Sequence, residues 1–169
     1  MFNKNIRFFG KHAILLKKYS NDKSSSEPVN FIVDNNDGEQ VSIYLFDTLL
    51  NAYMVCAMIG IIEERKVKSE PSSSPEYATI FTEILQKNRD NLNRIYQHMV
   101  LSESSVENID ESIKKAFSIN KLNDDEEQEK LEDYVRGGLE IVDEIFSDCK
   151  TYEDVANCII DLKERYALD

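Results

Sequence analysis

The sequence predicts an all-α (mainly α) fold, a bundle of five to six helices around one central apolar helix. The stretch from Ile43 to Ile62 is apolar almost without interruption, and the segments on either side place apolar residues at helical spacing. Short polar connectors rich in serine and proline separate these segments. A chain of 169 residues, 41% hydrophobic and 31% charged, can bury one core of its own. We therefore expect one helical domain over residues 1–169.

The N-terminal segment, residues 1–28, is basic and ends in the serine-rich connector NDKSSSEP, which predicts a loose attachment. Apolar residues at helical spacing predict a helix over residues 5–19. Residues 1–23 carry a charge of +5, whereas the other residues carry −17 and the whole chain −12. This balance excludes a surface that binds nucleic acid all over. Contact with DNA phosphates or with an acidic partner is predicted only for Lys4, Arg7, Lys11, Lys17 and Lys18.

A short β-hairpin is predicted near residues 30–43. The Asp37-Gly38 pair, which favours a tight turn, lies between the β-favouring runs NFIV and QVSI. A calcium-binding EF-hand loop is excluded, because such a loop needs glycine at its sixth position and glutamate at its twelfth. Counted from Asp34, these positions are Glu39 and Leu45.

The central helix is predicted to begin after Ser42 as its N-cap and to continue to about Lys66. Asp47 and Asn51 lie one turn apart near its start, and we expect a buried polar pair there. A hydrogen bond to a neighbouring helix and the helix dipole explain such a pair better than catalysis does. The same two residues favour a core helix over a membrane span.

Four further helices are expected towards the C-terminus. One runs over about seven turns from Tyr77, with Asn88 as the only gap in its apolar stripe, and a shorter one is capped by Ser104 or Ser105. The acidic run 121–130 leads into the third, and Thr151 caps the last. The predicted buried face of the last helix consists of Tyr152, Val155, Ala156, Ile159, Leu162 and Tyr166.

Gly137 and Gly138 lie inside the third of these helices. Each glycine costs about 1 kcal/mol relative to alanine in a helix interior. A pair kept there indicates a close approach by another helix, a kink, or a backbone surface open to a partner. As the partner-binding residues we predict Tyr134, Arg136, Gly137 and Gly138.

The sequence contains none of the common catalytic or cofactor-binding motifs, such as GxSxG, HExxH, CxxC or a glycine-rich phosphate loop. His12 and His98 are far apart and have no partner at ligand spacing. We therefore expect no enzyme, no cofactor and no metal. Cys56, Cys149 and Cys158 are odd in number and have no paired spacing, which favours reduced thiols and a cytoplasmic location.

Two stretches, YMVCAMIGIIEERK at 53–66 and YVRGGLEIVDEIF at 134–146, resemble small accessory proteins of bacterial anti-phage defence systems. The nearest families are proteins associated with DNA-phosphorothioation (Dnd) systems and the small subunits that accompany SMC-type ATPases in Lamassu-like operons. The resemblance implies a non-catalytic subunit that holds an ATPase or nuclease partner in a complex.

Three hypotheses about function follow. The first is this interaction subunit, and the second is a nucleic-acid-binding regulator that uses the basic N-terminal residues. The third is a hydrolase that uses Asp47 with Asn51.

Overall fold

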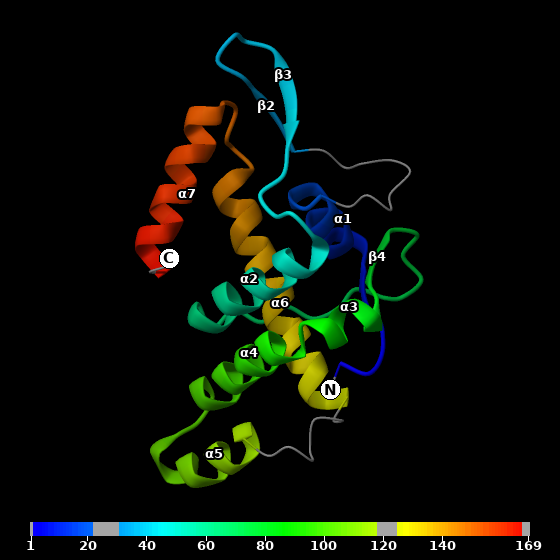
Figure 1. Cartoon of the computed structure of the whole chain (residues 1–169), viewed down its shortest axis with the longest axis vertical. Helices are drawn as coiled ribbons and strands as arrows, with labels where there is room; N and C mark the ends of the chain where they lie inside the picture. The colour runs from blue at the N-terminus through cyan, green and yellow to red at the C-terminus, as the bar shows by residue number, and fades with distance from the viewer. Residues whose placement is uncertain (1, 22–30, 118–124, 167–169) are drawn as a thin grey trace.

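The computed structural model describes residues 2–21, 31–117 and 125–166. This part of the chain is mainly helical, with seven α-helices, one short 3-10 turn and two small antiparallel sheets (Figure 1). In chain order the elements are β1 Ile6–Phe9, α1 Gly10–Tyr19, β2 Phe31–Asp34, β3 Gln40–Ile43, α2 Leu49–Ile62, β4 Tyr77–Ile80, α3 Thr82–Lys87, α4 Arg89–Ser102, η1 Val106–Asn108, α5 Ile109–Phe117, α6 Asp125–Phe146 and α7 Tyr152–Tyr166.

Helices α2 and α6 cross at the centre, and their contact is the most extensive between any two elements (Figure 1). Glycines on both helices make the crossing close. A Cβ atom on Gly60 would lie 2.0 Å from the carbonyl oxygen of Tyr134, and one on Gly138 would lie 1.9 Å from that of Cys56. Of the three alternatives that the sequence left open for Gly137 and Gly138, the structure shows the close approach by another helix.

The central helix is shorter than predicted. It begins at Leu49, where the Thr48 hydroxyl accepts a hydrogen bond from the backbone N–H of Asn51 at 3.1 Å. Ser42 is not its cap, because Ser42 pairs with Ile32 in a β-sheet. The helix ends at Ile62, and Glu64 adopts a φ of 53°, which no right-handed helix can continue.

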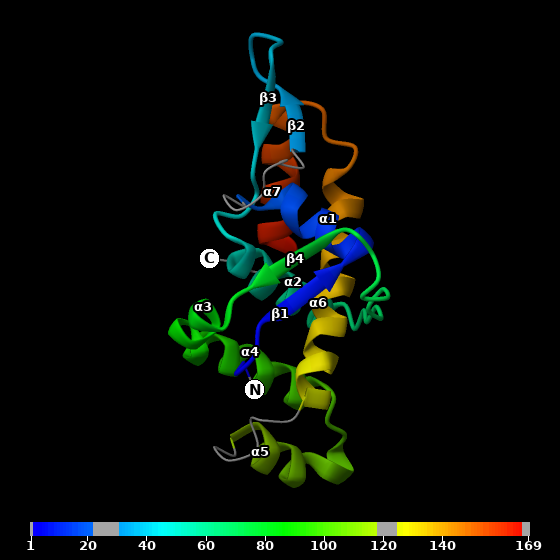
Figure 2. The same cartoon turned by 90° about the vertical axis from the view of Figure 1, so that its right-hand side faces the viewer.

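Two predicted helices begin in fact as strands. Ile6–Phe9 pairs antiparallel with Tyr77–Ile80, and the two strands lie side by side in Figure 2. Every second residue is buried, on one face of the two-stranded sheet: Ile6, Phe8, Ala78 and Ile80. The sequence does not reveal this alternation of buried and exposed residues, because apolar residues at helical spacing follow directly after each strand. At Gly10, with a φ of 57°, the chain turns from strand into helix.

The predicted hairpin near residues 30–43 is confirmed as β2 and β3, which project at one end of the molecule (Figures 1 and 2). Gly38 has the φ of 77° that its turn requires, and the Asn35 side chain accepts hydrogen bonds from the N–H groups of Asp37 and Glu39. Phe31 anchors the base of the hairpin, with its ring centroid 5.3 Å from that of Tyr19 and 6.4 Å from that of Phe146.

For the remaining helices, the sequence predicts capping residues correctly, but it does not predict which face of α7 is buried. The helical pattern after Tyr77 breaks at Asn88, between α3 and α4, and Ser105 caps the turn that leads into α5. Thr151 accepts a hydrogen bond from the N–H of Asp154 and caps α7, as predicted. The predicted face of α7 is wrong. Of its six residues, only Val155 and Tyr166 are buried, because α7 packs lightly on the end of α6.

Candidate functional site

The predicted partner-binding residues are buried inside the chain, which corrects the sequence-based assignment. Tyr134 is 4% exposed and Arg136 is 2% exposed, and both glycines pack against α2 and the residues just after it. The Arg136 guanidinium donates to the Asp133 carboxylate and to the carbonyl oxygen of Val67. These buried contacts stabilise the fold, and they leave no backbone exposed for a second protein to bind.

Most of the predicted N-terminal cations are neutralised by the acidic side chains of α6. The Nζ of Lys4 lies 2.8 Å from Asp125, that of Lys11 lies 3.2 Å from Glu140, and that of Lys18 lies 2.9 Å from Asp143. Lys17 lies over the ring of Tyr77 at 5.8 Å, and Arg7 is exposed on β1. The basic segment therefore docks on an acidic partner, which is a helix of the same chain.

Residue His12 has the most perturbed environment among these N-terminal groups. The imidazole is 3% exposed, and its Nε2 lies 3.3 Å from a carboxylate oxygen of Glu140 without the alignment of a hydrogen bond. Burial lowers its pKa, although the carboxylate of Glu140 opposes this shift. The ring is closed to dissolved substrates. His98, by contrast, is an exposed imidazole on α4.

The predicted buried pair of Asp47 and Asn51 does not form. Asp47 is exposed in the loop before Thr48, since the helix starts two residues after it, and Asn51 is half-buried in the first turn of α2. The expected burial assumed that the helix already included Asp47.

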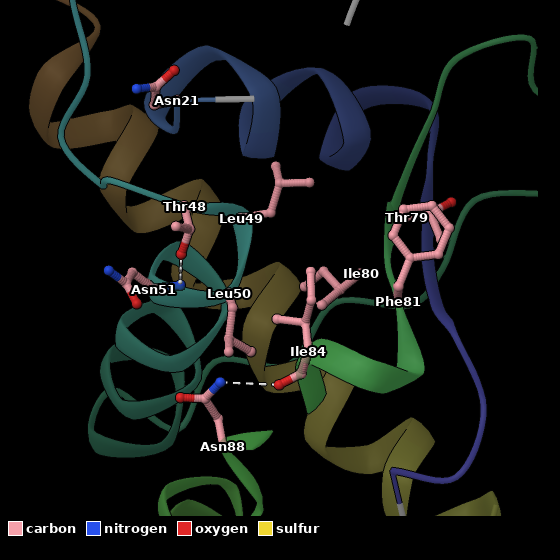
Figure 3. Close-up of a pocket in the computed structure, with 10 residues that line it drawn as sticks. All are labelled: Asn21, Thr48, Leu49, Leu50, Asn51, Thr79, Ile80, Phe81, Ile84 and Asn88. Atoms are coloured by element: carbon pink, nitrogen blue, oxygen red, sulfur yellow. Dashed lines mark hydrogen bonds between the residues drawn. The ribbon is translucent and has the colours of Figure 1, made fainter. Parts of the chain in front are cut away.

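Asn51 lies at a hollow of about 460 Å³ between the start of α2 and the β4–α3 connection (Figure 3). In Figure 3 apolar side chains form much of the wall, and the polar side chains of Asn21, Thr48, Thr79 and Asn88 complete it. The Asn88 amide donates to the carbonyl oxygen of Ile84 at 2.9 Å. The lining residues are Asn21, Thr48, Leu49, Leu50, Asn51, Thr79, Ile80, Phe81, Ile84 and Asn88. None of them is charged, so the hollow has no side chain suited to acid–base chemistry.

A second hollow of about 310 Å³ lies between α2, α6 and α7, and we refer to it as the α7 groove. Its lining is apolar except for one lysine: Leu45, Phe46, Val55, Ile59, Val142, Phe146, Ile159, Leu162 and Lys163. Ile159 is 43% exposed. A half-open apolar groove along a lightly packed helix has the character of a surface that receives another apolar element.

The sequence does not predict this groove, because its apolar residues have the spacing that is typical of a buried core. Ile159 and Leu162 belong to the predicted buried face of the last helix, and Phe46 falls within the range of the predicted central helix. One signal was present. Ile159 and Ile160 are adjacent, so the apolar surface of α7 is wider than one stripe, and Ile160 is 53% exposed.

Within the described residues, no group of three or more His, Cys, Asp or Glu side chains is arranged to hold a metal ion. Among the same residues, no helix has the length and apolar character needed to cross a bilayer. Comparisons with protein families, with curated proteins and with solved structures found no match to this chain.

Proposed function

We propose that the protein is a non-catalytic interaction subunit whose α7 groove receives an amphipathic helix of a partner protein. The observation that carries this proposal is the half-open apolar lining between α2, α6 and α7. In a chain with a net charge of −12, large apolar side chains exposed to water carry a cost unless another surface covers them.

The shape of the groove favours a helix over an extended peptide. One wall is α7, a helix of 15 residues and thus about 22 Å long, and the other walls are helices α2 and α6. The described strands do not contribute to the lining, so an extended peptide has no strand edge in the groove to pair with. A partner helix of three to four turns would place residues at positions i, i+3, i+4 and i+7 in the groove.

Charge at the edges of the groove predicts the flanks of that helix. Asp161 and Glu164 are exposed beside the lining residues of α7, and Asp47 is exposed directly after Phe46. The charged side chain in the lining itself is Lys163. We therefore expect an occupant with an apolar face and basic flanking residues, whose association weakens as salt is added.

We further propose that the occupant belongs to an ATPase or nuclease of a bacterial anti-phage complex. Support comes from the resemblance to defence accessory subunits, which rests on residues 53–66 and 134–146. These stretches form most of α2 and the second half of α6, two of the three walls of the groove. The alternative, a nucleic-acid-binding regulator, is less favoured because Lys4, Lys11 and Lys18 are already paired with carboxylates.

The test is co-purification with the products of neighbouring genes, using a matched pair of α7 variants. Ile159→Asp places a charge in the groove, and Ile160→Asp places the same charge on the adjacent residue, which does not line it. Both side chains are exposed, so both variants should fold.

We expect Ile159→Asp to lose the partner and Ile160→Asp to retain it. Equal retention by both variants would rule out the groove as the docking site. Failure of the wild-type chain to bind any neighbouring gene product, at low as well as physiological salt, would contradict the subunit proposal itself.

A further inference from the structure

Two cysteines lie close together at the connection between α6 and α7. Cys149 follows the end of α6 and is 8% exposed, and Cys158 lies in α7 and is more accessible. Their Sγ atoms are 3.4 Å apart. Each Sγ also lies near the carbonyl oxygen of Ile145, at 3.8 and 3.7 Å, so that one backbone oxygen holds both thiols on the same side. The third cysteine, Cys56, is fully buried in α2.

We propose that Cys149 and Cys158 are an oxidisable dithiol that a peroxide converts into an intramolecular disulfide between α6 and α7. The sulfur atoms need to approach from 3.4 Å to about 2.0 Å, which side-chain rotation can supply in a lightly packed connection. This inference does not depend on the occupant of the α7 groove.

The reaction proceeds in two balanced steps. The Cys158 thiolate attacks hydrogen peroxide, the O–O bond breaks, and a sulfenic acid and hydroxide form. The Cys149 sulfur then attacks the Cys158 sulfur, the S–S bond forms as the S–O bond of the sulfenic acid breaks, and the departing hydroxide takes the Cys149 proton and leaves as water. In total two thiols lose two electrons and two protons, and one peroxide becomes two waters.

The accessibility of Cys158 and the raised pKa of Cys149 determine which sulfur reacts with peroxide and which one closes the disulfide. Cys158 is the more accessible sulfur and reacts first with the oxidant. Burial raises the pKa of Cys149 to about 12, and its contact with Cys158 adds to the shift, so its thiolate is scarce at neutral pH. The rate of disulfide closure should therefore rise with pH as more Cys149 is ionised.

The bond would close a loop of ten residues between the end of α6 and the middle of α7, since the two cysteines are nine positions apart. A crosslink of this length reduces the freedom of the unfolded chain. Oxidation should therefore raise the melting temperature by about 5 °C, and the reductant dithiothreitol should reverse the rise.

The test is peptide mapping of the full-length protein after treatment with hydrogen peroxide and blocking of the remaining thiols. Trypsin cuts after Lys150, between the two cysteines, so the disulfide would join peptide 137–150 to peptide 151–163. We expect this linked pair to be the main oxidised product of the wild type, to persist in Cys56→Ser, and to be absent from Cys149→Ser.

Three results would overturn the proposal. The linked pair could be missing while both cysteines remain open to the blocking reagent. Cys158 could instead accumulate as sulfinic acid beside an intact Cys149 thiol, or the crosslink could join two molecules. Because the wild-type chain carries the main readout, a poorly folded variant would not obscure the answer.

Discussion

Replacing Gly138 by alanine tests whether the α2–α6 crossing depends on a missing side chain. In an ordinary helix this change stabilises by about 1 kcal/mol, because alanine restricts the unfolded chain and favours the helix. Here the added Cβ would lie 1.9 Å from the carbonyl oxygen of Cys56 and 2.6 Å from its carbonyl carbon. Both atoms belong to backbone, so no side chain can rotate away.

The size of the effect follows from this distance. Ordinary van der Waals contact begins at 3.4 Å, so the two helices would have to separate by about 1.5 Å. A gap of that size forfeits a large part of the dispersion attraction along the most extensive helix contact of the chain. Overpacking of a core costs about 1–3 kcal/mol or more. After the gain in helix propensity, we expect a net loss of about 2–3 kcal/mol in the free energy of unfolding.

The assay is urea unfolding followed by far-ultraviolet circular dichroism, with Gly38→Ala as the matched control. Gly38 has open space around its Cβ position but a φ of 77°, so alanine there should cost about 1 kcal/mol from backbone strain alone. A Gly138→Ala protein as stable as the wild type, or more stable by its helix propensity, would refute the close crossing.

Two further perturbations test buried groups. Arg136→Met removes the buried partner of the Asp133 carboxylate, which is 3% exposed and keeps the exposed Lys68, and should cost about 2–3 kcal/mol, whereas Arg165→Met at an exposed pair should cost under about 1 kcal/mol; equal midpoints in urea would contradict this. The lowered pKa of His12 means that the unfolded chain binds a proton more readily than the folded one, so stability is present above the ordinary value of 6.5 and is lost as pH falls below it. The urea midpoint of the wild type should therefore drop between about pH 7.5 and about pH 5.5, and it should drop less in His12→Gln; identical drops would mean that burial beside Glu140 does not control this titration.

The sequence predicted the features that depend on neighbours in the chain. The turn at Asp37-Gly38 and the cap at Thr151 are local, because a few adjacent residues satisfy one another's backbone groups. The close approach at Gly137 and Gly138 was one of three alternatives that the sequence left open, since a glycine pair in a helix has a cost that packing must offset.

The features that the sequence did not predict depend on distant residues. Nothing near Ile6 indicates that Ile80 will pair with it, and a four-residue strand followed by a helix preserves the apolar spacing of a longer helix. The same limit explains the partner-binding assignment. A glycine face can be filled by a helix of the same chain or of another, and only the fold shows that α2 fills it.

The sequence also did not predict that the α7 groove is open. Apolar spacing shows that Ile159 and Leu162 lie on one side of a helix, but it does not show whether anything covers that side. Contacts at both ends of α7 hold this helix at its distance from α2. Thr151 bridges to Asp34 at one end, and Arg165 and Tyr166 bond to Glu63 at the other.

The most direct measurement of the central proposal is an isoleucine-methyl NMR spectrum of the chain with its co-purified partner. If a partner helix occupies the α7 groove, the methyl signals of Ile59 and Ile159 should shift, while that of Ile113, exposed on α5, should stay in place. Shifts confined to Ile80 and Ile84, which line the hollow of Figure 3, or to Ile113 would place the partner elsewhere and contradict the proposal.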